Sequence, residues 1–214
     1  MLQKTGLIDK LFSELQHGLN TCHLIPGIEA RPYPANTAID IEPLSDAERD
    51  HSAGLMRVNN AGEVAAQGLY RGQALGARKQ ALGIAMKKAA EEENEHLRWC
   101  QLRLAELGHK RSNLDGLWYW GSYGIGALAS SVGDRWSLGF VKETELQVCA
   151  HLDHHLSRLP PPDKRSRAIL EAMKRDELQH ADNAEQAGAA VLPRPVRTLM
   201  KLISKIMTIS AYRI

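Results

Sequence analysis

Two short stretches, Glu93-Asn94-Glu95-His96 and Glu177-Leu178-Gln179-His180, share the pattern Glu-x-x-His. On an α-helix, residues three apart lie on one face, with their Cβ atoms about 5–6 Å apart. A carboxylate and an imidazole at that spacing can bind the same metal ion. Two such pairs, joined by one further glutamate from each of two other helices, form a dinuclear metal site in a four-helix bundle. The repeated pattern therefore predicts helices and requires two more glutamates.

Glu63 precedes the first pair and Glu145 precedes the second at nearly the same separation. A helical hairpin with arms of similar length brings the two members of each half to one level along the bundle. The first hairpin is expected to turn near 78–80, and the second at 159–163, where three consecutive prolines break a helix. The predicted metal ligands are Glu63, Glu93, His96, Glu145, Glu177 and His180. Spacing alone also admits Glu143 in place of Glu145.

A single Glu-x-x-His is weak support for a metal, because Glu and His at this spacing are common on helix surfaces. Two copies with matched upstream glutamates favour a metal site. Four buried carboxylates would repel one another, and two divalent ions would balance their charge. Oxygen and nitrogen donors without a thiolate suit iron or manganese better than structural zinc. The ligand types do not distinguish iron from manganese.

Four long helices are expected to form an all-α bundle, and no strand signal is found. A capping box at Ser45 begins the first helix, which runs to about residue 78. The others are predicted at 81–107, ending at Gly108, at 134–158, and from Asp163 to about 190. Residues 45–214 form the expected catalytic domain. Residues 1–44 form an amphipathic segment and a proline-containing connector. The segment is expected to be a short amphipathic helix that packs on another element, because leucines recur every four residues: Leu7, Leu11, Leu15 and Leu19.

Net charge, cysteine spacing and the N-terminal residues limit the classes of function to consider. The chain has 214 residues and a formal net charge of +2, which gives no general argument for nucleic-acid binding. Three widely spaced cysteines indicate a reducing compartment and small buried side chains rather than disulfides. The first twenty residues lack the long apolar core of a signal peptide.

Two apolar segments need a separate explanation. Residues 114–132 contain a long uncharged run that approaches the length of about 20 residues needed to span a bilayer. This segment is interpreted as a buried crossover helix, a helix that dips into a membrane, or a span. Near the C-terminus, apolar residues form one helical stripe: Val196, Leu199, Met200, Ile203, Ile206 and Met207. Basic residues occupy the opposite side: Arg194, Arg197, Lys201 and Lys205. Such a helix binds either a membrane surface or the bundle, and peripheral membrane contact is favoured.

The order of the motifs resembles a known family. Arg57-Val58-Asn59-Asn60-Ala61-Gly62-Glu63 comes first, and Glu93 with His96 follows. Gly133-Asp134-Arg135, then Glu145 with His151, and finally Asp176-Glu177 with His180 complete the series. The series resembles the demethoxyubiquinone hydroxylases, ferritin-like di-iron monooxygenases of ubiquinone biosynthesis, over residues 45–214.

The resemblance implies a role for each ligand. Glu63 and Glu145 would be terminal ligands of two iron ions, Glu93 and Glu177 would bridge them, and His96 and His180 would each bind one. The spacing to His151 favours Glu145 over Glu143. From their positions on the helices, His151 and Tyr70 are candidates for places beside the ligands, with an ordinary core position as the alternative for Tyr70. His154 and His155 are expected at the surface.

The implied reaction is hydroxylation of the ring of a polyprenylated methoxy-methyl-benzoquinol with O2, with NADH as a candidate reductant. Peripheral association with the cytoplasmic side of the cell membrane, a homo-oligomer and accessory proteins of ubiquinone biosynthesis are further expectations. Two alternatives stay open: another ferritin-like di-iron oxidase or peroxidase, and a non-catalytic iron-binding membrane bundle.

Overall fold

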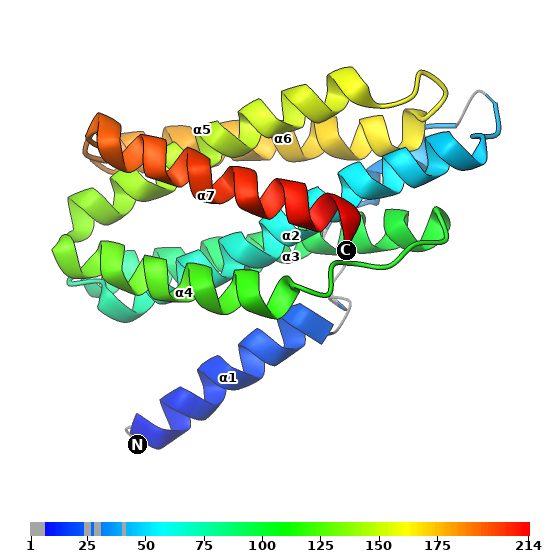
Figure 1. The fold of residues 1–214 in the computed structure, drawn as a ribbon. Coiled ribbons are helices and arrows are strands. Elements are labelled where there is room, and N and C mark those ends of the chain that lie inside the picture. The colour runs from blue at the N-terminus through cyan, green and yellow to red at the C-terminus, as the bar shows by residue number, and fades with distance from the viewer. Residues whose placement is uncertain (1–6, 24–26, 28–30, 40–41) are drawn as a thin grey trace.

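The computed structural model describes residues 7–23, 27, 31–39 and 42–214. These residues form seven α-helices and one short 3-10 helix, and no strand occurs among them (Figure 1). The elements are α1 (Leu7–His23), η1 (Pro34–Thr37), α2 (Asp46–Gly76), α3 (Gln80–Glu106), α4 (Asp115–Val132), α5 (Asp134–Arg158), α6 (Lys164–Gln186) and α7 (Arg194–Arg213). The predicted all-α, ferritin-like class is confirmed.

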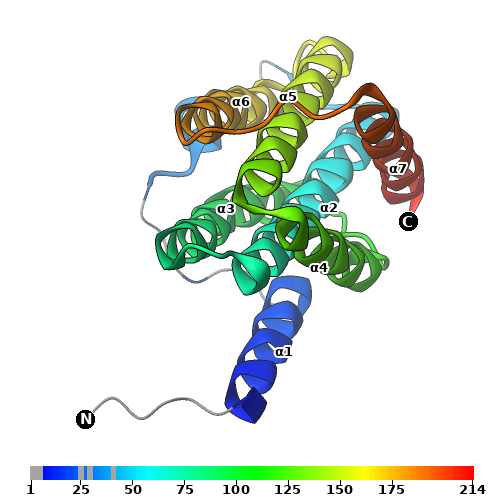
Figure 2. The ribbon, with the colours of Figure 1, turned by 90° about the vertical axis from the view of Figure 1, so that its left-hand side faces the viewer.

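Four helices, α2, α3, α5 and α6, form the bundle, and short turns join α2 to α3 and α5 to α6 (Figures 1 and 2). The helix α4 is the crossover between the two hairpins. The helix α7 runs back along the outside of the bundle. This arrangement matches the expected crossover helix and C-terminal amphipathic helix.

Local signals explain the helix ends. The side chain of Ser45 accepts a hydrogen bond from the backbone N–H of Glu48, and the Glu48 side chain bonds back to Ser45, which completes the capping box. Gly108 and Gly188 have positive φ angles of 75° and 95° and follow the ends of α3 and α6. The prediction that the last bundle helix reaches about 190 is wrong, because Gly188 favours the left-handed backbone that ends it.

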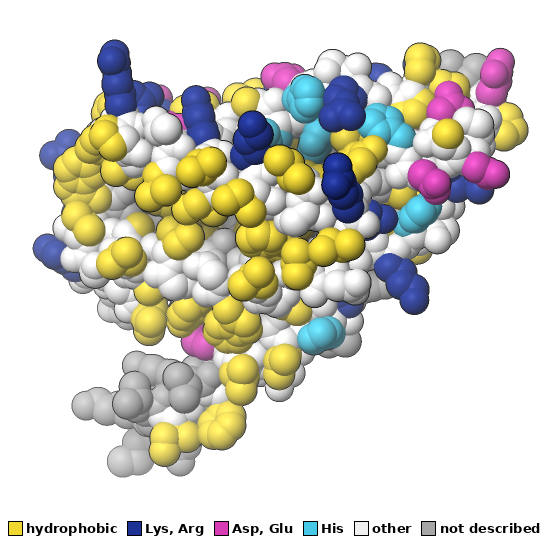
Figure 3. Space-filling model, viewed as in Figure 1, with side chains coloured by type: hydrophobic (Ala, Val, Ile, Leu, Met, Phe, Trp, Pro, Cys, Tyr) yellow, Lys and Arg dark blue, Asp and Glu magenta, His cyan; other side chains and the backbone are white. Residues whose placement is uncertain are grey.

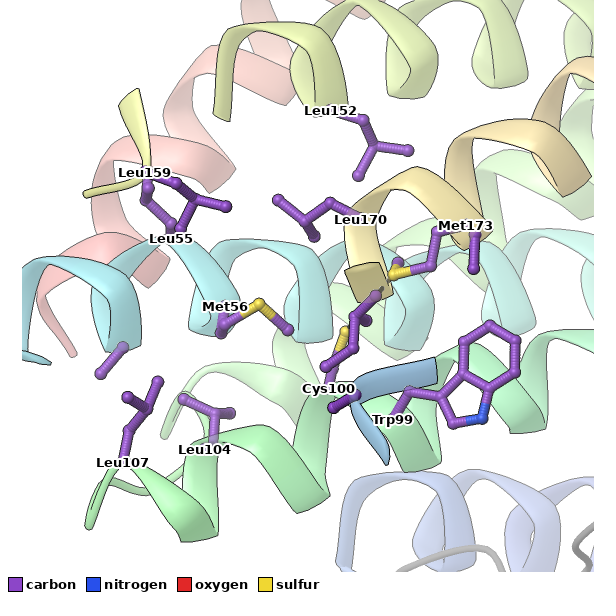
Figure 4. Close-up of a cluster of buried hydrophobic side chains, with 14 of the residues drawn as sticks. Leu55, Met56, Trp99, Cys100, Leu104, Leu107, Leu152, Leu159, Leu170 and Met173 are labelled. Atoms are coloured by element: carbon purple, nitrogen blue, oxygen red, sulfur yellow. Dashed lines mark hydrogen bonds between the residues drawn. The ribbon is translucent and has the colours of Figure 1, made fainter. Parts of the chain in front are cut away.

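The two larger of the four buried apolar clusters form layers within the bundle, and a polar layer lies between them. One layer joins all four bundle helices around Met56, Leu104, Leu152 and Met173 (Figure 4). The other gathers around Tyr70 further along the bundle. On each helix the predicted ligands lie between the residues of the two layers, so packing on both sides holds them at one level.

Backbone contact between α2 and α4 fixes the crossover helix. A Cβ at Gly72 would lie 2.0 Å from the carbonyl oxygen of Tyr123, and a Cβ at Gly126 would lie 2.2 Å from that of Leu69. Only glycine permits such an approach. The other side of α4 is exposed, with Leu128 at 69%. Among the described helices, none is both long and apolar enough to cross a membrane.

The helix α1 packs on α2 and α4 through small and polar residues. Gly18 lies against the rings of Tyr119 and Trp120, and Arg71 donates two hydrogen bonds of 2.8 Å to Glu14. The predicted packing of this helix on another element is confirmed, although Leu15 and Leu19 are each 45% exposed. The side chains of Leu7 and Leu11 lie outside the described residues. All three cysteines are free and buried, as expected.

Candidate metal centre

Each bundle helix contributes one buried glutamate to the polar layer. The exposed fractions are 3% for Glu63 on α2, 1% for Glu93 on α3, 2% for Glu145 on α5 and 2% for Glu177 on α6. Burial of four carboxylates in one place is costly unless cations or protons balance them. The six residues predicted from the sequence are all brought together here.

The donors form two overlapping groups, each with its ligand atoms within 4.8 Å of one another. The His96 group contains Glu63, Glu93, His96 and Glu177, and the His180 group contains Glu93, Glu145, Glu177 and His180. Glu93 and Glu177 belong to both groups, which is the arrangement expected of bridging carboxylates. Glu143 belongs to neither, and its Oε1 accepts a hydrogen bond from Gln147 instead.

Both imidazoles turn Nδ1 towards the shared carboxylates. His96 Nδ1 lies 2.9 Å from Glu93 Oε2 and 3.0 Å from Glu177 Oε1. His180 Nδ1 lies 3.2 Å from Glu93 Oε1 and 3.2 Å from Glu177 Oε2. The two halves are therefore related by an approximate twofold arrangement that follows the repeat in the sequence.

An acidic residue immediately before each Glu-x-x-His faces the histidine of the other motif. Asp176 Oδ2 lies 2.9 Å from His96 Nε2, and Glu92 Oε2 lies 3.7 Å from His180 Nε2. Carboxylates commonly accept the outer N–H of a metal-binding histidine and so fix the ring orientation. No role is predicted above for Glu92 or Asp176, although an acidic residue precedes both Glu-x-x-His motifs and this repeat is a usable signal.

Electrostatics show how the protein alone balances this charge. Burial raises the pKa of Glu63 and of Glu145 well above the usual value. Burial also raises the pKa of Glu93, but hydrogen bonds from His180 and His96 outweigh it and hold that pKa low. Burial opposes protonation of His180, yet the contacts with Glu177 and Glu93 raise its pKa to about 11. Protons therefore occupy sites that two divalent cations would take over on binding.

The donor set fits a metal in a further respect. Glu93 Oε1 is fully buried, and His180 Nδ1 lies 3.2 Å from it, so this oxygen and this imidazole nitrogen could bind one cation together. Tyr70 is also buried, and its hydroxyl donates a hydrogen bond to Oε1 of the predicted ligand Glu145. A cluster with these residues can hold a metal ion.

The three histidines of α5 separate in the structure. His151 is half-buried and lines a groove together with Glu63, and His154 is exposed. The prediction that His155 is a surface residue is wrong: it is 5% exposed, and its Nδ1 lies 2.9 Å from Asn59 Oδ1. Asn59 on α2 supplies the polar partner that lets an imidazole enter the core.

His155 gives a prediction about acid stability. Burial, followed by the charges of His151 and His154, lowers its pKa to about 3, so the unfolded chain binds its proton first as the pH falls below about 6.5. At pH 5, protonation of His155 in the unfolded chain should lower the free energy of unfolding by about 2 kcal/mol. In urea titrations at pH 7 and pH 5, His155→Gln should lose that much less stability than the wild type. Equal losses in both proteins would contradict the assignment.

An apolar groove of about 620 Å³ leads to the centre. It runs between α4 and α7 over α2 and α5, and Glu63 and His151 are among its lining residues. Figure 3 shows hydrophobic side chains gathered over α4 and α7, with Lys and Arg side chains along α7. Most of the apolar stripe predicted for α7 lines the groove: Val196, Leu199, Met200, Ile203 and Met207. Ile206 of the stripe and Leu202, which lies outside it, are each 56% exposed and do not line the groove.

Comparisons with known proteins give one family for the chain. Residues 50–211 match the family described as "Ubiquinone biosynthesis protein COQ7". A 3-demethoxyubiquinol 3-hydroxylase of Chromobacterium violaceum is 52% identical over 208 residues, covering 97% of this chain and 100% of the relative. Proteins of the same name from Xanthomonas campestris and Bordetella petrii are 53% and 50% identical, over 96% and 98% of this chain and 94% and 93% of their own lengths.

Proposed function

Because this chain belongs to the COQ7 family of ubiquinone biosynthesis proteins, we propose that it is a 3-demethoxyubiquinol 3-hydroxylase with a di-iron centre. The observation that carries the metal centre is the sharing of Glu93 and Glu177 between the His96 group and the His180 group. Glu63 and His96 would complete one iron site, and Glu145 and His180 the other. Bound iron would supply the redox chemistry that activates O2.

The groove supports a quinol with a long apolar tail as the substrate. Its wall is mainly apolar and reaches Glu63, so a ring carried on an isoprenoid chain can approach the centre while the tail stays between α4 and α7. Burial followed by the charge of His154 lowers the pKa of His151, so this imidazole is neutral and can accept a hydrogen bond from a quinol hydroxyl. The apolar wall also excludes water from the reacting ring.

A deletion strain tests the assignment directly. Cells that lack the endogenous 3-demethoxyubiquinol 3-hydroxylase should accumulate the demethoxy quinone, and expression of this chain should restore ubiquinone. Quinones are measured by liquid chromatography with mass spectrometry. Persistent accumulation of the demethoxy compound, with the chain expressed and loaded with iron, would favour the alternative of another ferritin-like oxidase. NADH as reductant, a homo-oligomer and accessory proteins stay predictions.

The exposed faces of α4 and α7 support peripheral binding to the cytoplasmic side of the cell membrane. Apolar side chains at the mouth of the groove, flanked by basic residues of α7, have the composition of a helix that lies in the interface. A substrate with an insoluble tail could then enter the groove from the bilayer. This surface explains why the outer residues of α7 are apolar although they contact little of the bundle.

Paired substitutions on α7 test this surface. Leu202→Asp with Ile206→Asp should weaken binding to anionic phospholipid vesicles by about 3 kcal/mol, on the order of 100-fold in partition coefficient, because two apolar side chains no longer enter the lipid. Neither residue lines the groove, so the centre stays intact. Vesicle sedimentation measures the effect, with Ile39→Asp plus Ile84→Asp as control, since these are 86% and 61% exposed elsewhere on the protein. Equal loss in both pairs would contradict the proposed face.

A further inference from the structure

Arg31, in the connector before η1, contacts residues of α3 and α6 that lie next to the candidate metal ligands. Its Nη1 lies 2.8 Å from Asp176 Oδ2, and its Nε donates a hydrogen bond to Glu95 Oε2. Its guanidinium carbon lies 4.9 Å from the centroid of the Trp99 ring. Two ion pairs and one cation–π contact therefore hold one side chain that belongs to neither hairpin.

The contacts of Arg31 continue to a proposed ligand. The same Asp176 Oδ2 lies 2.9 Å from His96 Nε2, and the Trp99 ring centroid lies 5.3 Å from that of His96. Asp176 is 26% exposed, so water can compete for its carboxylate unless another group holds it. A planar guanidinium that bridges Asp176 and Glu95 fixes the direction of that carboxylate.

The His180 side is held differently. Glu92, which occupies the place of Asp176 in the repeat, is 47% exposed and lies 3.7 Å from His180 Nε2. Its other partner is Lys88, which is 75% exposed and therefore gives a weak contact. The approximate twofold arrangement of the ligands does not extend to their outer partners, and the difference originates in a residue outside the family-matched range 50–211.

We propose that Arg31 is a positioning residue that acts through Asp176 on His96 and makes the His96 group the tighter of the two metal sites. The inference rests on the proposed di-iron centre. A carboxylate held in place keeps the His96 ring oriented with Nδ1 towards Glu93 and Glu177 before a metal arrives. The His180 ring, with a longer and more exposed outer contact, has less of this preorganisation.

Anaerobic titration with Co2+, whose visible absorption reports its ligand geometry, tests the inference on the full chain. The wild type should bind two ions in two resolved steps. In Arg31→Gln the tighter step should weaken by about 10- to 100-fold, the usual effect of losing an outer partner, and its absorption band should shift. The weaker step should change little. Arg49→Gln is the matched control, because Arg49 is 46% exposed against 47% for Arg31 and also pairs with an aspartate.

A second pair of variants separates positioning from general stability. If Arg31 acts through Asp176, then Arg31→Gln added to Asp176→Asn should cause no further loss of affinity. Additive losses, or a tighter step in Arg31→Gln equal to that of the wild type, would overturn the inference. Arg31→Lys, which keeps the charge without the planar fork, should show a smaller loss and serves as the test if Arg31→Gln does not fold. Failure of the wild type to bind two ions would instead refute the metal centre itself.

Discussion

Glu177→Ala should lose both iron ions and quinol hydroxylation together, because Glu177 is the only ligand of α6 besides His180 and belongs to both groups. We expect the rate to fall by more than about 1,000-fold, equivalent to ~4 kcal/mol of activation free energy. Iron per chain, measured by colorimetric assay after desalting, should fall well below one. Helix content should stay near that of the wild type, since the two apolar layers on either side of the ligands are unchanged.

Two further variants test whether the loss of iron is specific to the ligands of each metal site. Glu63→Ala removes a member of the His96 group alone, so about one ion per chain should remain in the His180 group. Glu143→Ala is the control, because it removes a carboxylate from the same helix as Glu145 but from neither group. Wild-type iron content and rate in Glu177→Ala would exclude the proposed centre.

The ligand set was predictable because helical periodicity and hairpin length determine which residues share a level. Glu93 and His96 face one way on α3 whatever else the chain does, and the turn at 159–163 sets the level of Glu145 against Glu177. Spacing alone did not decide between Glu143 and Glu145. Residues two apart on a helix point to nearly opposite sides, so the choice depends on which side of α5 faces the other bundle helices.

The outer contacts were predictable only in part. Asp176 and Glu92 follow the same repeat as the ligands, so their facing positions are a consequence of the hairpin geometry. Arg31 is different: its connector has no periodicity, and its contact with Asp176 depends on the path of the chain across α3 and α6. His155 was assigned to the surface because nothing local shows that Asn59 on another helix accepts its hydrogen bond.

Apolar composition likewise did not decide what α1, α4 and α7 contact. An apolar stripe looks the same in the sequence whether it packs on a neighbour, lines a groove or meets lipid. For α1, the buried face is made by Gly18 and by polar pairs such as Glu14 with Arg71, while Leu15 and Leu19 stay exposed. For α7, most of the stripe lines the groove, whereas Ile206 and Leu202 are exposed outside it.

Gly62→Leu should block the approach of the quinol ring without disturbing the metal. Gly62 lines the groove beside Glu63, and a Cβ built there meets no heavy atom of the described residues within 4 Å. A leucine side chain would therefore extend into the groove where the ring must lie. We expect kcat/KM to fall by about 100-fold, equivalent to ~2.7 kcal/mol, with iron content equal to that of the wild type.

The matched control is Gly62→Ala, which adds one methyl group at the same place. Both variants replace glycine inside α2, which should raise unfolding free energy by up to about 1 kcal/mol through helix propensity. Thermal unfolding of the iron-loaded proteins measures this gain. A stabilised Gly62→Leu with two irons and little activity separates access to the centre from the centre itself. Because the substrate route and the metal site share only Glu63 and its neighbours, full activity in Gly62→Leu would place the quinol ring elsewhere while leaving the ligand assignment untouched.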